Sequence, residues 1–268
     1  MGFFIDLIKN IYYVFKKIDK KLFLSHRNKA EKKMNISNTK DLSQGPIKIL
    51  IYAPSGAGKT FSAKTIKDKA LIISAEAGLL PLADSNIDVI NLHIDDNGKP
   101  IDLPDRVYRL GQAYDFLCKE KKYDTIFIDS LTEISQIINE FTDKLFPDRK
   151  DSLVKWNEYN KKMVSIIKKF RDLPNYNVIF TCLSVIEKDE NNKRYTAFST
   201  YGSISNRLAQ YFDEVFYLHN VNEDGQIKRF FQTQNENQII SKDRSTKLAL
   251  YEPVDFNNIF NKMRGPKK

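Results

Sequence analysis

Residues 53–60, APSGAGKT, constrain the fold of this chain more than any other stretch of it. They follow a recurring pattern of a small residue, four residues of any kind, and then Gly, Lys and Thr, which cradles phosphate groups. The flanking residues fit this pattern, because residues 47–52 predict a buried strand and residues 61–69 predict a helix that begins at Lys59. The sequence therefore predicts a strand, a tight phosphate-binding loop and a helix in direct succession.

Each position of this loop has a chemical reason. The Gly-Ala-Gly run at residues 56–58 lets the backbone curl so that its N–H groups face inward, where the helix N-terminus adds partial positive charge. Lys59 would reach the β- and γ-phosphates of ATP, and the Thr60 hydroxyl would bind Mg²⁺. The first position is Ala53 instead of the usual glycine, which requires a negative φ there. A glycine-rich turn that binds no ligand is the alternative interpretation.

Two further predicted strands end in carboxylates. Residues 70–74 predict a strand with Glu76 just beyond it, and residues 125–128 predict a strand that ends at Asp129. Ligands gather at the carboxyl ends of parallel strands, so Asp129 is expected to hold Mg²⁺ through water. A carboxylate at Glu76 could polarise the water that attacks the γ-phosphate. Taken alone, Glu76 fits a solvated loop residue better.

The residue after Asp129 bears on which carboxylate activates water. Ser130 stands there instead of Glu, which favours Glu76, and Glu133 one helical turn later is the second candidate. The predicted nucleotide-binding residues are Ala53, Pro54, Ser55, Gly56, Ala57, Gly58, Lys59, Thr60, Phe61 and Asp129, with Thr60 and Asp129 as the Mg²⁺ ligands.

The remaining apolar patterns predict an α/β fold with a mainly parallel sheet flanked by helices. Further strands are expected at residues 87–94, 177–183, 215–218, 229–232 and 248–251, and helices at 103–117, 131–145, 156–170 and 257–263. The last three strands are expected as antiparallel additions to the sheet edge. Trp156 and both cysteines, Cys118 and Cys182, are expected in the core, and Thr181 or Ser184 could sense the γ-phosphate. Neither the cysteines nor the three histidines have metal-ligand spacing.

The positive charge of the chain is concentrated at its beginning. The net charge is +9, and residues 1–45 hold ten Lys and Arg against four Asp and Glu. Residues 1–24 predict a basic amphipathic helix, and residues 25–45 a polar linker. Three interpretations of the helix stay open: it lies on a membrane surface, it packs on this or another chain, or it precedes a true start at Met34. No stretch reaches the roughly twenty apolar residues that span a bilayer.

Four segments, APSGAGKT, SAEAG, IFIDS and VIFTCLS in this order, resemble the RecA-like branch of phosphate-loop ATPases. More narrowly, residues 45–252 resemble the phage AAA-type nucleotide-binding proteins related to single-strand annealing recombinases. The resemblance implies a RecA-like core, with Glu76 as the water-activating base. It also implies that Lys242 and Arg244, a Lys-x-Arg pair, reach the nucleotide of a neighbouring subunit in a homo-oligomeric ring. Ala53 and the basic N-terminal extension depart from the family pattern.

Residues 184–205 predict a long polar loop after a central strand. Lys188, Lys193, Arg194 and Tyr195 cluster there, and cations with aromatic rings suit single-stranded DNA. The alternative is a solvated hairpin, because acidic residues dilute this charge. DNA-binding loops in this region of RecA-like proteins favour the first interpretation.

Together these patterns predict a cytoplasmic ATPase core at residues 46–255, followed by a short helix and tail at 256–268. It would bind ATP and Mg²⁺ and act on single-stranded DNA in recombination or annealing. The alternative is a nucleotide-gated binding module with little hydrolysis that docks a partner protein or a membrane surface through residues 1–22.

Overall fold

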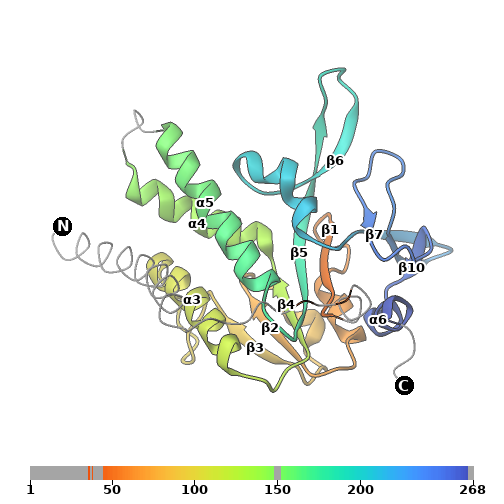
Figure 1. Ribbon diagram of the computed structural model, residues 1–268, viewed down its shortest axis with the longest axis horizontal. Helices are drawn as coiled ribbons and strands as arrows, with labels where there is room; N and C mark the ends of the chain where they lie inside the picture. Colours follow the sequence, from red (N-terminus) through yellow and green to blue (C-terminus); the bar gives the residue numbers. More distant parts are fainter. Residues whose placement is uncertain (1–35, 37, 39–44, 148–151, 265–268) are drawn as a thin grey trace. The chain divides into compact units, whose positions relative to one another are not determined.

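The computed structural model describes residues 36, 38, 45–147 and 152–264 (Figure 1). The chain divides into two units, residues 1–45 and residues 46–268, and all that follows concerns the second. The helix predicted at residues 1–24 and nearly all of the linker predicted after it lie outside the described residues. Among the helices that are described, none is both long and apolar enough to cross a membrane.

A single sheet forms the centre of the second unit, and its described part has ten strands. Along the main path the order is β10-β8-β7-β1-β5-β4-β2-β3, with β6 paired to β5 and β9 paired to β7. The strands are β1 (Lys48–Ala53), β2 (Ala70–Ser74), β3 (Asp88–Asn91), β4 (Thr125–Asp129), β5 (Asn177–Lys188), β6 (Arg194–Phe198), β7 (Glu214–Glu223), β8 (Gln226–Gln232), β9 (Lys242–Asp243) and β10 (Tyr251–Pro253). All pairs from β3 to β7 along this path are parallel, and the pairs that include β6, β8, β9 or β10 are antiparallel. The predicted fold class is therefore confirmed.

Helices cover the sheet. They are α3 (Leu103–Lys119), α4 (Leu131–Leu145), α5 (Ser152–Arg171) and α6 (Phe256–Arg264), with 3-10 helices η1 (Thr60–Thr65), η2 (Leu80–Leu82) and η4 (Gly202–Tyr211). In Figure 1, α3, α4 and α5 lie to one side of the central strands, and α6 lies beside β1 and β7. Strands covered in this way read as continuous apolar runs, as residues 49–53 do.

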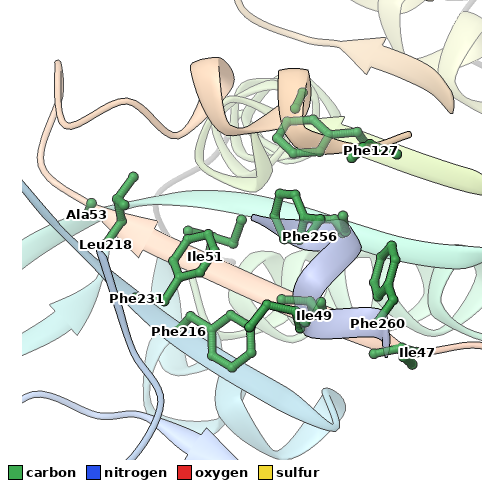
Figure 2. Packing of buried hydrophobic residues seen from close by; sticks show 14 of the residues in the cluster. Ile47, Ile49, Ile51, Ala53, Phe127, Phe216, Leu218, Phe231, Phe256 and Phe260 are labelled. Atoms are coloured by element: carbon green, nitrogen blue, oxygen red, sulfur yellow. The ribbon is translucent and has the colours of Figure 1, made fainter. Parts of the chain in front are cut away.

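A hydrophobic core lies between the sheet and α6. Because side chains alternate along a strand, Ile49 and Ile51 face this core, together with Phe127 of β4. Phe256 and Phe260 of α6 lie over these residues (Figure 2). Residues beyond 255 therefore contribute to the same core as the ATPase residues predicted at 46–255.

The helix after the phosphate loop is shorter than predicted. A 3-10 helix covers Thr60–Thr65, and Ile66 is already extended, so the prediction of a helix to residue 69 is wrong. Side-chain hydroxyls donate to backbone carbonyls that helical N–H groups would otherwise use. Ser62 Oγ donates to Lys59 O at 2.5 Å, and Thr65 Oγ1 donates to Ser62 O at 2.8 Å. Such local hydrogen bonds compete with the α-helical pattern.

The strand β7 runs parallel to β1, whereas the sequence predicted an antiparallel addition. The connection from β6 to β7 contains η4, which is long enough to bring the chain back in the parallel direction. The antiparallel prediction is confirmed for β8, which pairs with β7. The strand predicted at residues 248–251 lies later in the chain, at Tyr251–Pro253 (β10), and it pairs antiparallel with β8.

The region predicted as a long polar loop is mostly a hairpin. Strand β5 continues to Lys188, and β6 returns antiparallel to it from Arg194. This hairpin projects beyond the other strands of the unit (Figure 1). The turn is closed by Asp189, whose carboxylate accepts from the backbone N–H groups of Asn191 and Lys193 at 2.9 and 2.8 Å.

Two residues predicted to lie in the core do not. Trp156 is half-buried, with its ring against Tyr159 and the ammonium of Lys155 at 4.8 Å from the ring centroid. Cys118 is exposed near the end of α3, because Leu117 occupies the buried position of that turn. Cys182 is buried as predicted.

Candidate functional site

The phosphate loop takes the strained turn that its glycines permit. Gly56 and Gly58 have φ of 76° and 106°, in the region that side chains disfavour. Ala53 remains part of the extended strand β1, as its side chain requires. Lys59 follows directly and is 7% exposed, with Nζ donating to Ala53 O at 3.0 Å and to Pro54 O at 2.9 Å. The ammonium of Lys59 is thus held by the backbone carbonyls at the end of β1 and the start of the loop.

Thr60, the first residue of η1, contacts Asp129, the last residue of β4. Thr60 Oγ1 donates to Asp129 Oδ2 at 2.6 Å, although the two residues are far apart in the sequence. The other carboxylate oxygen, Oδ1, accepts from Thr181 Oγ1 at 2.5 Å. Asp129 is 2% exposed, so both of its oxygens are held by hydroxyls in a buried place. The hydroxyl of Thr181 therefore contacts the predicted metal ligand Asp129, whereas the sequence suggested a contact with the γ-phosphate.

A hydroxyl and a carboxylate beside a phosphate loop suit Mg²⁺, which prefers oxygen ligands and keeps several waters. The described residues include no cluster of three or more His, Cys, Asp or Glu side chains that could bind a metal alone. The contact between Thr60 and Asp129 brings the two predicted Mg²⁺ ligands together, and their role in holding Mg²⁺ with nucleotide phosphates and water stays a prediction.

Glu76 lies at the same edge of the sheet. Ser74 pairs with Asp129 in the register of β2 and β4, and the N–H groups of Ala75 and Glu76 both donate to Asp129 O, at 2.6 and 3.3 Å. This pairing carries the Glu76 side chain to Ser130, whose hydroxyl donates to Glu76 Oε1. Ser130 also caps α4. The carboxylate predicted to activate water is thus held next to the predicted metal ligand.

Glu133 belongs to the same acidic edge. Its backbone N–H donates to Ser130 Oγ at 3.3 Å, in the first turn of α4. Burial and the charge of Glu76 raise the pKa of the Glu133 carboxyl above its ordinary value. The structure therefore brings both predicted candidates for the water-activating base to one place.

The ammonium of Lys59 is influenced by two opposite effects in the site. Burial lowers the pKa of the Lys59 ammonium, and the carboxylates of Glu76 and Asp129 counteract that shift. The two carboxylates thus favour the charged form of the lysine, and that charge is what binding of phosphate requires.

Lys242 and Arg244 lie apart from these residues. Lys242 Nζ donates to Ala209 O at 2.6 Å and also to Phe212 O, so it is used within its own chain. Arg244 pairs with Asp213 at 2.9 Å, and its side chain is 61% exposed. An exposed arginine can reach a second subunit, whereas Lys242 would first have to release two carbonyls. Their proposed role in trans stays a prediction.

One residue at the loop was not predicted. Arg229 of β8 donates from Nε to Ala57 O at 3.1 Å, and its guanidinium carbon is 5.2 Å from the centroid of the Phe61 ring. Nothing in the local sequence around Arg229 indicates this contact, because it joins positions 172 residues apart. Only the pairing of β8 with β7 and of β7 with β1 brings Arg229 to the loop.

A second feature of the unit is a cleft away from the loop. Residues of the β5–β6 hairpin and of the segment before β9 line a cleft of about 540 Å³. Its lining residues are Asp189, Lys193, Arg194, Tyr195 and residues 235–240. A hydrogen bond from Thr196 N to Gln238 O at 3.0 Å ties the two segments together.

A comparison with family models gives one match. A model described as an AAA domain matches residues 45–245, which include the phosphate loop, Glu76, Asp129, Lys242 and Arg244. No curated protein matches the chain.

Proposed function

The chain belongs to the AAA domain family of phosphate-loop ATPases, and from this premise we propose that it hydrolyses ATP with Mg²⁺ and acts on single-stranded DNA in recombination or annealing. The observation that carries the ATPase proposal is the meeting of Thr60, Asp129 and Glu76 at one edge of the sheet. Lys59 and the loop would bind the phosphates. Thr60 and Asp129 would hold Mg²⁺, which withdraws charge from the phosphate oxygens.

Hydrolysis would need Glu76 to orient a water in line with the γ-phosphate. The carboxylate now accepts from Ser130, which holds it at the carboxyl edge of the sheet near Asp129. From there it would take the proton of the attacking water. Glu133 is the reserve for this role, since its backbone N–H contacts Ser130 and its raised pKa makes its carboxylate a stronger base.

The DNA part of the proposal is supported by the hairpin. Lys188, Lys193 and Arg194 have no ion pair among the residues that the structure describes. Two of the three acidic neighbours make other contacts, because Asp189 accepts from backbone N–H groups and Glu187 accepts from Tyr195 at 2.7 Å, whereas Glu190 is exposed. The cations of the hairpin are exposed and would be available to phosphates of a single strand, and the cleft beside them is lined by polar groups and by one aromatic side chain, Tyr195.

The two proposed sites share one strand. Thr181, which donates to Asp129, and Lys188, at the hairpin, both belong to β5. A strand that contacts the metal ligand at one position and DNA a few residues later gives DNA a direct route to alter hydrolysis. Stimulation by DNA is therefore the expected property.

The test is the rate of ATP hydrolysis with and without single-stranded DNA at two salt concentrations, with Lys59→Ala as the inactive control. We expect DNA to raise the rate and higher salt to weaken this effect, because phosphate contacts release counterions. ATP binding with a low rate that DNA does not change would refute the DNA role. It would favour a nucleotide-gated module that docks a partner protein or a membrane surface through residues 1–22.

A further inference from the structure

Arg229 stands out because it contacts the phosphate loop from a strand with no assigned role. Residues alternate faces along β8, so Arg229 shares a face with Phe231, and Phe231 belongs to the core between the sheet and α6. Its cross-strand partner on β7 is Asn220, two residues after the core residue Leu218. The core row of the β7–β8 hairpin therefore ends in an arginine placed at the loop.

The contact is close and specific. Arg229 Nε donates to Ala57 O at 3.1 Å, and a Cβ added at Gly58 would come within 2.6 Å of Arg229 Nε. Gly58 is required by its φ of 106°, and any side chain there would displace the Arg229 side chain from its place at the loop. The guanidinium also lies 5.2 Å from the centroid of the Phe61 ring, so two groups fix its plane.

The direction of the hydrogen bond explains what Arg229 does. A phosphate loop binds its ligand through N–H groups, so the carbonyl oxygens must find partners away from the ligand. Arg229 supplies one, since it bonds the carbonyl between Ala57 and Gly58. Within the described residues Arg229 has no carboxylate partner that would draw it elsewhere. Holding this carbonyl fixes the peptide whose N–H belongs to Gly58.

We propose that Arg229 is a positioning residue that holds the phosphate loop in its ATP-receiving conformation before the nucleotide arrives. This inference rests on the proposed function for its ligand, ATP. It assigns to the β7–β8 hairpin a role in nucleotide affinity that neither the loop motif nor the metal ligands include.

The test compares Arg229→Met, which keeps an apolar stem and loses the donor, with Arg229→Lys and with Lys228→Met as a matched control. Lys228 directly precedes Arg229 in the same strand and pairs with the exposed Glu223. Its replacement by methionine removes one positive charge, as Arg229→Met does. Binding of fluorescent ATP with Mg²⁺ gives the Kd, steady-state rates give KM and kcat, and hydrogen exchange of amides 56–60 is measured in nucleotide-free protein.

We expect Arg229→Met to raise the Kd and KM for ATP about tenfold, because the variant loses one charge-assisted hydrogen bond. The kcat should be nearly unchanged. Amide exchange at residues 56–60 should become faster without nucleotide. Arg229→Lys should be intermediate in both readouts, because an ammonium can donate to Ala57 O but has no plane to stack on Phe61. Lys228→Met should match the wild type.

Two outcomes would overturn the proposal. One is unchanged ATP affinity in Arg229→Met. The other is weaker affinity with unchanged amide exchange, because Arg229 would then act on the ligand directly. If the methionine variant fails to fold, Arg229→Lys decides by the same criteria. If the wild type itself does not bind ATP, the proposed function fails, while exchange in nucleotide-free protein still tests Arg229.

Discussion

Glu214 gives the chain a pH dependence that can be measured. It is the first residue of β7, it is fully buried, and it faces Asp243 in the antiparallel register of β7 and β9. Its Oε1 accepts from Ser245 N at 3.3 Å. Its other carboxylate oxygen, Oε2, is buried and has no hydrogen-bond partner among the described residues. Burial first, and then the charge of Asp243, raise the pKa of Glu214 from its ordinary value of 4.5 to about 9.

The sign of the effect follows from linkage. A carboxyl whose pKa is raised by folding binds its proton more tightly in the folded state, so its contribution is complete below pH 4.5 and is lost as the pH rises towards about 9. At about pH 7.5 the shift corresponds to a loss of at most about 4 kcal/mol of unfolding free energy relative to pH 4.5, at about 1.4 kcal/mol per pH unit. Glu214→Gln keeps the shape, does not titrate, and offers an amide that can donate to Asp243.

The assay is urea unfolding of the wild type and of Glu214→Gln from pH 5 to 9, with Glu223→Gln as the control. Glu223 lies at the exposed end of the same strand and pairs with Lys228. We expect the difference in unfolding free energy between Glu214→Gln and the wild type to grow steadily with pH in favour of the glutamine. Other titrating groups cancel in this difference. A difference that is constant with pH, or that grows in favour of the wild type, would refute the reasoning.

Three further predictions concern the site and the core. Glu76→Gln should bind ATP normally and lose hydrolysis, measured by binding and turnover on the same sample; normal turnover would transfer the role to Glu133. Thr181→Val removes the 2.5 Å hydrogen bond to Asp129 at constant volume, so half-maximal hydrolysis should need several-fold more Mg²⁺, with Thr181→Ser restoring the wild-type value. Equal Mg²⁺ requirements in all three proteins would exclude this role. Phe256→Ala should lower the unfolding free energy by about 3–5 kcal/mol, because the ring is fully buried, and a change below about 1 kcal/mol would show that α6 is dispensable.

Several features of this protein follow from local sequence. The phosphate loop is recognisable because its glycines, Lys59 and Thr60 are consecutive and the flanking periodicities are strong. The helices α3 and α4 and the strands β1, β2 and β4 begin and end within a few residues of the predicted ranges, since each has an apolar pattern of its own. Asp129 was identified by its place after a buried strand, and its meeting with Thr60 agrees with that.

Tertiary structure decided the rest. The direction of β7 depends on how far the connection through η4 carries the chain, and the length of η1 depends on hydroxyls that compete with its backbone. Arg229 reaches Ala57 only because two strand pairings place it there, and Glu214 is buried only because β9 returns to face it. An apolar period reports which face of an element is buried. Which residue of a distant segment lies opposite is set by register and packing across the whole sheet, and no local pattern contains that information.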